Sequence, residues 1–202
     1  LYDDQALTQQ AAQVRKAIVE QSYDGEFFVD NAVRGKGGKL EVTRNRTETC
    51  QYYAFYLGTA TPQSHPELWA KMMNEFGPVR QTSKAYPEIH PSNAFIGNYL
   101  RMELLSSEGR SKQILEENQS YYLPMARQTG TLWENMTTSA SCNHGFAAHM
   151  ARVLYRDVLG VYDISPTEKP VTLRPSDCNG TCRTGRLPAG KECAEATATS
   201  PT

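Results

Sequence analysis

Two short polar stretches near the end of the chain carry the residue types best suited to chemistry. Trp133 and Glu134 are neighbours in the sequence GTLWEN, and Asn143 and His144 are neighbours in SCNHGF. A carboxylate beside an aromatic ring fits carbohydrate chemistry, because sugar rings have apolar C–H faces while their hydroxyl groups need polar partners. Glycoside hydrolysis needs two carboxyl groups, one on each side of the scissile bond. These residue types therefore make Glu134 a candidate catalytic carboxylate and Trp133, Asn143 and His144 candidate substrate-binding residues.

Each of these four residues also has a structural interpretation. Glu134 could be a solvated loop carboxylate, which the Trp-Glu pair alone favours, and Trp133 could fill the core beneath the loop. Asn143 suits the N-cap of a following helix, and His144 would then lie in its first turn. The Asn143-His144 pair at a predicted helix start favours a catalytic Glu134 over a solvated loop carboxylate.

Glu48 and His90 are further candidates for substrate binding, because both lie in polar loops that lead into predicted helices. Both residues also have a structural interpretation instead of a substrate-binding one. Glu48 follows Asn45 by three residues, the spacing of a helix-capping pair, and His90 precedes Pro91 in a turn.

Other kinds of site receive less support. Cys142 lies two residues from His144, but at a helix start two such side chains point in different directions. The sequence GKGG at 35–38 lacks the strand-to-helix setting of a phosphate-binding loop. Cys178 and Cys182 have no second pair to complete a zinc site. We therefore predict neither a metal nor a cofactor.

Hydrophobic periodicity predicts the helices that position these residues. Six helices are expected, over residues 4–22, 47–58, 66–77, 92–109, 111–127 and 143–159. The first, third and fifth have rich polar faces, whereas the others carry more Tyr, Phe, Ala and Gly. This alternation predicts an all-α fold of consecutive helical hairpins, a toroid or solenoid with outer and inner helices. The long polar loops before the inner helices would then meet on one rim, where a site is expected.

The bulk composition sets the domain organisation. The chain has 202 residues, 39% of them hydrophobic, which suffices for one domain and an extension. We assign residues 1–162 to the helical domain and residues 163–202 to the extension, the start of a truncated β-domain with one strand at VTLRP and a disordered end. The formal net charge of -1 gives no reason to expect nucleic acid or a membrane surface as a partner.

The five cysteines do not form a disulfide framework for the helical domain. Their number is odd, and Cys178, Cys182 and Cys193 fall in the extension, where their pairing is left open. The compartment is also left open, with an extracellular or periplasmic location slightly favoured.

The stretches TGTLWEN and SCNHGFAAHMARVLYRDVLGV together resemble the C-terminal half of the catalytic domain of α-L-rhamnosidases, glycoside hydrolase family 78. The stretches FFVDN, TETCQYYAFYLG and FIGNYLRMELLSSEG resemble the preceding helices of that domain. The resemblance covers residues 1 to about 175 and implies an (α/α)6 toroid, the six-hairpin glycosidase fold. It also implies an inverting mechanism with Glu134 as general base and His144 in contact with the sugar.

The sequence departs from this family in three ways. The spacer between Glu134 and Asn143 is short, the general acid of the family falls upstream of residue 1, and the extension does not alternate as β-strands do. The expected partners are therefore a carbohydrate, such as a terminal rhamnose, and a missing N-terminal part of the same enzyme. The isolated chain is expected to be inactive.

Two other functions stay open. One is a different α/α-toroid enzyme, such as a polysaccharide lyase, which would need Arg or Lys at the rim; Arg34 and Arg44 are the candidates. The other is a helical-repeat binding fragment without catalysis.

Overall fold

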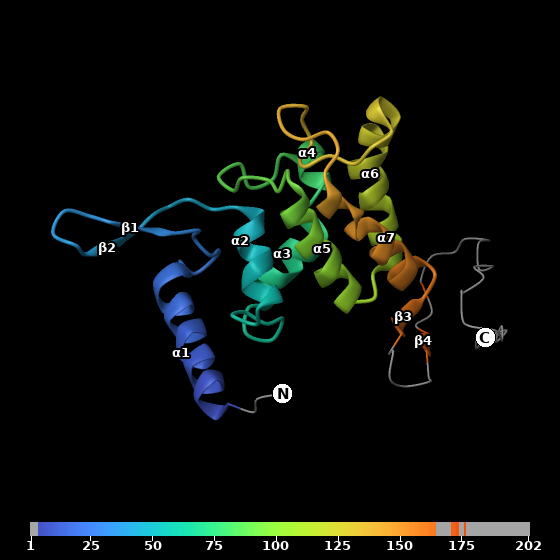
Figure 1. Cartoon of the computed structure of the whole chain (residues 1–202). Coiled ribbons are helices and arrows are strands. Elements are labelled where there is room, and N and C mark those ends of the chain that lie inside the picture. Colours follow the sequence, from blue (N-terminus) through green and yellow to red (C-terminus); the bar gives the residue numbers. More distant parts are fainter. Residues whose placement is uncertain (1–3, 165–170, 174–175, 177–202) are drawn as a thin grey trace.

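A computed structural model describes residues 4–164, 171–173 and 176 of the chain (Figure 1). Helices predominate among them, which confirms the predicted all-α class. The helices are α1 (Gln5–Ser22), α2 (Glu48–Tyr56), α3 (Pro66–Glu75), α4 (Val79–Ser83), α5 (Phe95–Ser107), α6 (Ser111–Thr129) and α7 (His149–Val153). A 3-10 turn, η1 (Gly145–Ala148), precedes α7, and a π-helical turn, η2 (Leu154–Val158), follows it.

Two short antiparallel hairpins complete the described fold. Strand β1 (Ala32–Arg34) pairs with β2 (Leu40–Val42), and β3 (Val161–Ile164) pairs with β4 (Val171–Leu173). Strand β4 confirms the strand predicted in VTLRP. The rest of the predicted extension, with its three cysteines and its end, lies outside the described residues.

The main core forms where α2 packs against α5, with α3 and α6 beside them. Its members are large aromatic and aliphatic side chains that water barely reaches. They include Phe27, Tyr52, Leu68, Met72, Met73, Phe76, Leu100, Leu105 and Ile114. A second, smaller cluster lies under the loop that follows α6 and contains Tyr121, Tyr122, Met125, Trp133 and Ala147.

Helices α2, α5 and α7 begin at the same end of the molecule, and α6 runs in the opposite direction (Figure 1). Two bridges join the loops at this end: Thr47 pairs with His90 in parallel, and Ala94 pairs with Asn135 antiparallel. The polar loops before these helices therefore lie side by side, as the hairpin prediction requires. Closure of the hairpins into a toroid remains a prediction.

The predicted capping pair of Asn45 and Glu48 is wrong, and so is the pair that the same three-residue spacing would predict for Ser64 and Glu67 before α3. The N-cap of α2 is Thr47, whose hydroxyl accepts the Cys50 N–H at 3.0 Å, while the Asn45 amide turns to Asn31. Helix α3 begins at Pro66, as predicted for the first turn, but the Ser64 hydroxyl bonds to Thr61 and caps nothing. The three-residue spacing alone does not predict the N-cap, because several short polar side chains near each helix start compete for the same backbone N–H groups.

The apolar face of α1, which carries Leu7, Val14 and Ile18, is not covered by any described element. Helix α1 has no buried residue, and Leu7, Val14 and Ile18 on that face are exposed. The helix projects from the body and reaches it through its last turn (Figure 1) and through Arg15, which donates to the Leu57 carbonyl. The periodicity therefore predicted the helix correctly, but the structure shows no partner for its apolar face within the described residues.

The described part of the chain contains three elements that were not predicted: the hairpin β1–β2, the helix α4 and the strand β3. The hairpin β1–β2 projects from the body (Figure 1), and α4 is a single short helix between α3 and the Tyr86–His90 loop. No described helix is both long and apolar enough to cross a membrane.

Candidate functional site

Glu134 lies at the rim, against the start of α5. Its carbonyl accepts the Phe95 N–H at 3.0 Å, and its own N–H donates to the Ser141 carbonyl at 2.9 Å. Its side chain is half-buried, and Oε2 accepts the Ser141 N–H at 3.4 Å. No described residue donates a hydrogen bond to Oε1. One oxygen of this carboxylate is therefore available to a water or a sugar hydroxyl.

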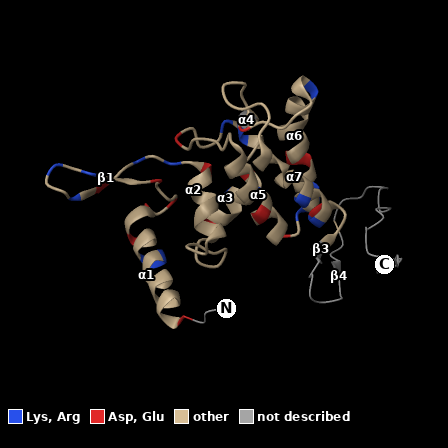
Figure 2. Ribbon diagram, in the orientation of Figure 1, with Lys and Arg blue, Asp and Glu red and all other residues tan. Residues whose placement is uncertain are grey.

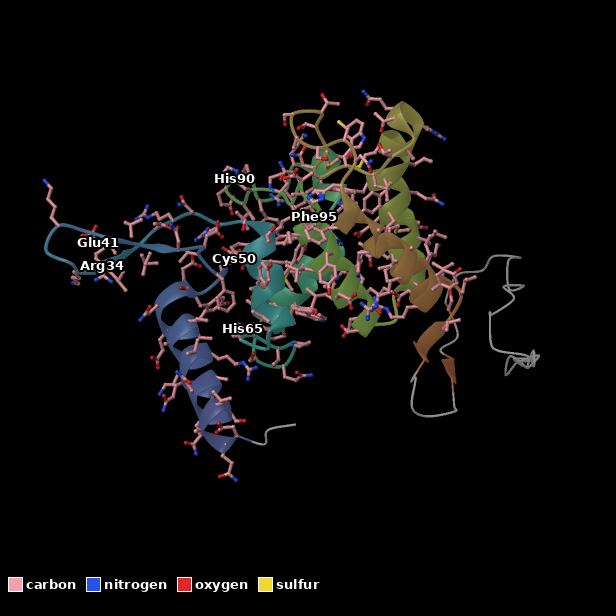
Figure 3. The ribbon with its side chains drawn as sticks, viewed as in Figure 1. Arg34, Glu41, Cys50, His65, His90 and Phe95 are labelled. Atoms are coloured by element: carbon pink, nitrogen blue, oxygen red, sulfur yellow. The ribbon has the colours of Figure 1, made fainter. Side chains whose placement is uncertain are left out.

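His144 and Glu134 have Phe95 as a common neighbour, Glu134 through its backbone carbonyl and His144 through its ring. The centroids of the His144 and Phe95 rings are 4.6 Å apart, and the His144 N–H donates to the Leu132 carbonyl at 2.9 Å. Figure 3 shows Phe95 at the start of α5, at the same end of the molecule as His90. The structure thus brings together two of the predicted residues, Glu134 and His144, around a third that was not predicted.

Trp133 belongs to the second core cluster. Its side chain is 4% exposed, packs with Tyr121 and Met125, and donates its indole N–H to the Thr129 hydroxyl at 2.7 Å. The ring therefore offers no open face to a sugar in this structure. Of the two interpretations of the sequence, the structure supports the core residue, and the substrate-binding role is corrected accordingly.

Glu48 is a buried structural carboxylate. Its Oε1 accepts hydrogen bonds from Arg80 Nη1 at 2.7 Å and from the Gly77 N–H at 3.2 Å. Its Oε2 accepts from the Ser92 N–H at 2.9 Å and the Tyr52 hydroxyl at 3.3 Å. Both oxygens are occupied and the side chain is 1% exposed, so Glu48 joins α2 to α4 and to the Ser92 loop and has no oxygen left for a substrate.

Asn143 and His90 are both exposed. His90 donates its N–H to the Arg46 carbonyl and accepts the Glu48 N–H, so its backbone bridges two loops, as expected of a turn residue. Asn143 is not an N-cap, because η1 begins at Gly145 with His144 before it. Its side chain faces solvent near Glu134, whose backbone pairs with Ser141 two residues away.

A buried ion network ties α5 to α7 and η2 below this rim. Glu103 on α5 accepts from His149 Nε2 at 2.8 Å, and from Arg152 and Arg156 at 2.8 and 2.7 Å. Burial alone would raise the pKa of Glu103, but the bonds from His149 and Arg156 outweigh it and lower that pKa to about 2. Figure 2 shows basic residues, in blue, on the ribbon around α7. The network fixes the helix that follows His144.

A polar groove of about 660 Å³ lies between α4 and α6. It is lined by amide, hydroxyl and carboxylate side chains together with apolar residues that include Tyr121 and Met136. The polar lining residues are Asn74, Thr82, Gln113, Glu116, Glu117 and Ser120. Glu134, His144 and Phe95 do not line it, but it reaches the rim loop at Met136, whose N–H donates to the Asn93 carbonyl.

Two aromatic residues of the rim, Phe95 and Phe146, were not among the predicted site residues. Phe146 belongs to the helix predicted over residues 143–159, and it is 70% exposed. Its ring lies 5.5 Å from that of Phe95 and 5.4 Å from that of His144. The helix begins with a 3-10 turn, whose side-chain directions differ from the α-helical periodicity on which the prediction rested.

Among the described residues, no three His, Cys, Asp or Glu side chains are grouped so as to hold a metal ion. No protein-family model, curated protein or solved structure matches the chain.

Proposed function

We propose that this chain is the C-terminal part of a glycoside hydrolase similar to the inverting α-L-rhamnosidases, with Glu134 as its general base. The observation that carries the proposal is the position of Glu134. It is a half-buried carboxylate with one available oxygen. Its backbone carbonyl accepts the N–H of Phe95 at the start of α5, and the His144 ring packs against the same Phe95.

The chemistry follows from that position. A water bound to Glu134 gives up a proton to the carboxylate as its oxygen attacks the anomeric carbon, and the bond to the leaving oxygen breaks. A second carboxyl group protonates that oxygen from the other side. In an inverting enzyme the two groups stand about 6.5–9.5 Å apart, which leaves room for the water. The resemblance places this acid upstream of residue 1, and no residue described here is assigned to it.

The other candidate groups support this assignment by elimination. Glu48 is saturated with hydrogen bonds. Cys142 has its sulfur 3.8 Å from the Ala140 carbonyl, and the His144 ring packs against Phe95 and Phe146, so no thiol–imidazole pair forms. His144 is left to bind a sugar hydroxyl with a ring nitrogen, and Asn143 to offer its exposed amide.

The alternative functions have less support. A lyase needs cations to neutralise a uronate. Arg34 lies on the projecting hairpin, away from Phe95 (Figure 3), and donates to the Gly38 carbonyl, which leaves the exposed Arg44 in the loop before α2 as the one candidate of the two. A binding fragment without catalysis would have Glu134 pointing into solvent or core, with no pocket beside Trp133.

The nature of the product separates these functions. The full-length gene product is incubated with an aryl α-L-rhamnoside, and the first sugar formed is observed by proton NMR before it mutarotates. We expect the β anomer. First formation of the α anomer would contradict the inverting mechanism. An unsaturated sugar absorbing in the ultraviolet, formed from a uronate polysaccharide, would indicate a lyase.

A further inference from the structure

Three aromatic rings converge at the rim beside Glu134. The Phe95 and His144 planes are tilted by 58°, those of Phe95 and Phe146 by 34°, and those of His144 and Phe146 by 38°. All three pairs of centroids lie within 4.6 to 5.5 Å. The three rings are therefore tilted against one another and do not form a parallel stack. We call Phe95, His144 and Phe146 the aromatic corner, of which Phe146 is the exposed member.

The aromatic corner is held by the backbone. The Phe95 N–H donates to the Glu134 carbonyl, and the His144 carbonyl accepts the Ala147 N–H at 3.1 Å, which fixes the turn that carries Phe146. Ala147 itself is fully buried in the second core cluster. Phe146 is thus an exposed ring on a hydrogen-bonded turn, next to a buried residue. Contiguous apolar surface marks a binding site more than a single exposed side chain does, and the Phe146 ring adjoins the rings of Phe95 and His144.

Polar groups border the aromatic corner on one side. The Glu134 carboxylate and the exposed Asn143 amide belong to the loop that ends at His144, and the hydroxyls of Thr137 and Ser139 lie in the same loop. An apolar surface of aromatic rings next to carboxylate, amide and hydroxyl groups suits a molecule that has one C–H face and several hydroxyl groups. A sugar ring has this composition.

We propose that Phe146, with Phe95 and His144, forms the surface on which the apolar face of the sugar packs during the reaction of Glu134. This inference rests on the proposed function and adds to it a substrate-binding residue. It gives Phe146 the stacking role that Trp133, being buried, does not have.

Kinetics on the full-length gene product test the role of Phe146. Phe146→Leu keeps an apolar side chain but removes the ring, and Phe146→Tyr keeps the ring. Loss of stacking weakens the ground state and the transition state alike, so KM should rise about 5-fold with kcat little changed. Phe146→Tyr should restore the wild-type KM.

The matched control is Tyr155→Leu. Tyr155 is also an exposed ring (55%), but it lies on η2, so its replacement should leave KM unchanged. An unchanged KM in Phe146→Leu would overturn the inference.

A binding measurement tests the same residue without activity. Full-length protein labelled with 4-fluorophenylalanine is titrated with methyl α-L-rhamnoside, and the fluorine resonance of Phe146 is identified by its loss in Phe146→Leu. We expect this resonance to shift on titration. A shift confined to other phenylalanines, or a Phe146 shift produced by tetramethylammonium and not by the sugar, would contradict the inference.

The two proposals can fail separately. If Glu134→Gln is inactive but Phe146→Leu has a normal KM, only the stacking role is wrong. If the Phe146 resonance responds to sugar but Glu134→Gln remains fully active, the surface binds sugar and the catalytic assignment is wrong.

Discussion

The Glu48 carboxylate and the Arg80 guanidinium lie 2.7 Å apart, and their side chains are 1% and 5% exposed. The pair joins the first turn of α2 to α4, and Arg80 also donates to the carbonyls of Ala85, Tyr86 and Ile89. One ion pair therefore organises the loop that runs along the rim. Its role is to position the site and not to act on a substrate.

We expect Glu48→Gln to lower the free energy of unfolding by about 3–5 kcal/mol, because it leaves the Arg80 charge buried without its counterion. Urea unfolding followed by circular dichroism measures this. The control is Glu20→Gln, which removes one partner of the exposed Lys16–Glu20 pair and should change stability by less than about 1 kcal/mol. A Glu48→Gln variant of normal stability that has lost activity would instead indicate a direct catalytic role.

Stability should fall in acid because of Glu103. Its pKa is lowered from 4.5 to about 2 in the folded state, so the ionised form stabilises the fold above pH 4.5. This contribution, about 2–3 kcal/mol, is lost as the pH falls from 4.5 towards 2. Urea unfolding at pH 5 and pH 3 should show a smaller change in Glu103→Gln than in the wild type. Equal pH dependence in both proteins would show that Glu103 does not contribute.

Trp133 should matter for stability and not for sugar binding. Trp133→Ala is expected to cost about 3–5 kcal/mol, because it opens a cavity between Tyr121 and Met125. Trp133→Phe keeps most of the packing and should leave KM within about 2-fold of wild type, since the ring has no open face. A large rise in KM for a stably folded Trp133→Phe would restore the stacking role to this residue.

Gly97 allows α5 to approach the Ser92 loop. A Cβ on Gly97 would lie 1.5 Å from Ser92 Oγ, 2.7 Å from Ser92 Cβ and 2.9 Å from Thr49 Oγ1. Gly97→Ala should therefore destabilise the protein by about 1–3 kcal/mol, although alanine favours helices. Thermal unfolding measures this, with Gly145→Ala as control, because no atom lies within 4 Å of its added Cβ. An unchanged or raised Tm in Gly97→Ala would show that the loop yields at no cost.

The helices could be predicted from the sequence because their apolar periodicity is local information. The loops before α2, α5 and α7 were also correctly expected to meet, since alternating outer and inner helices place them at one end. Helix caps could not be predicted reliably, because Asn45 and Thr47 both have suitable side chains and only the surroundings choose between them.

The candidate site could be predicted only in part. Glu134 and His144 were identified from residue type and resemblance, and the structure places both against Phe95. Which aromatic ring is exposed is a tertiary property: Trp133 lies over the end of α6 and is buried, whereas Phe146 lies on a 3-10 turn and faces solvent. The sequence holds no signal that distinguishes these two rings.

The central claim is that Glu134 activates the attacking water. Glu134→Gln and the matched control Glu116→Gln, an exposed carboxylate (63%) on α6, are compared with wild type in the full-length gene product. An aryl α-L-rhamnoside serves as substrate, and unfolding curves confirm that both variants fold.

Loss of a general base typically costs about 10²–10⁴-fold, so we expect kcat of Glu134→Gln to fall by that factor with KM nearly unchanged, while Glu116→Gln remains like wild type. In Glu134→Ala, added azide should restore turnover and yield the inverted glycosyl azide, because this anion attacks without a base. Wild-type kcat in a folded Glu134→Gln variant would contradict the account.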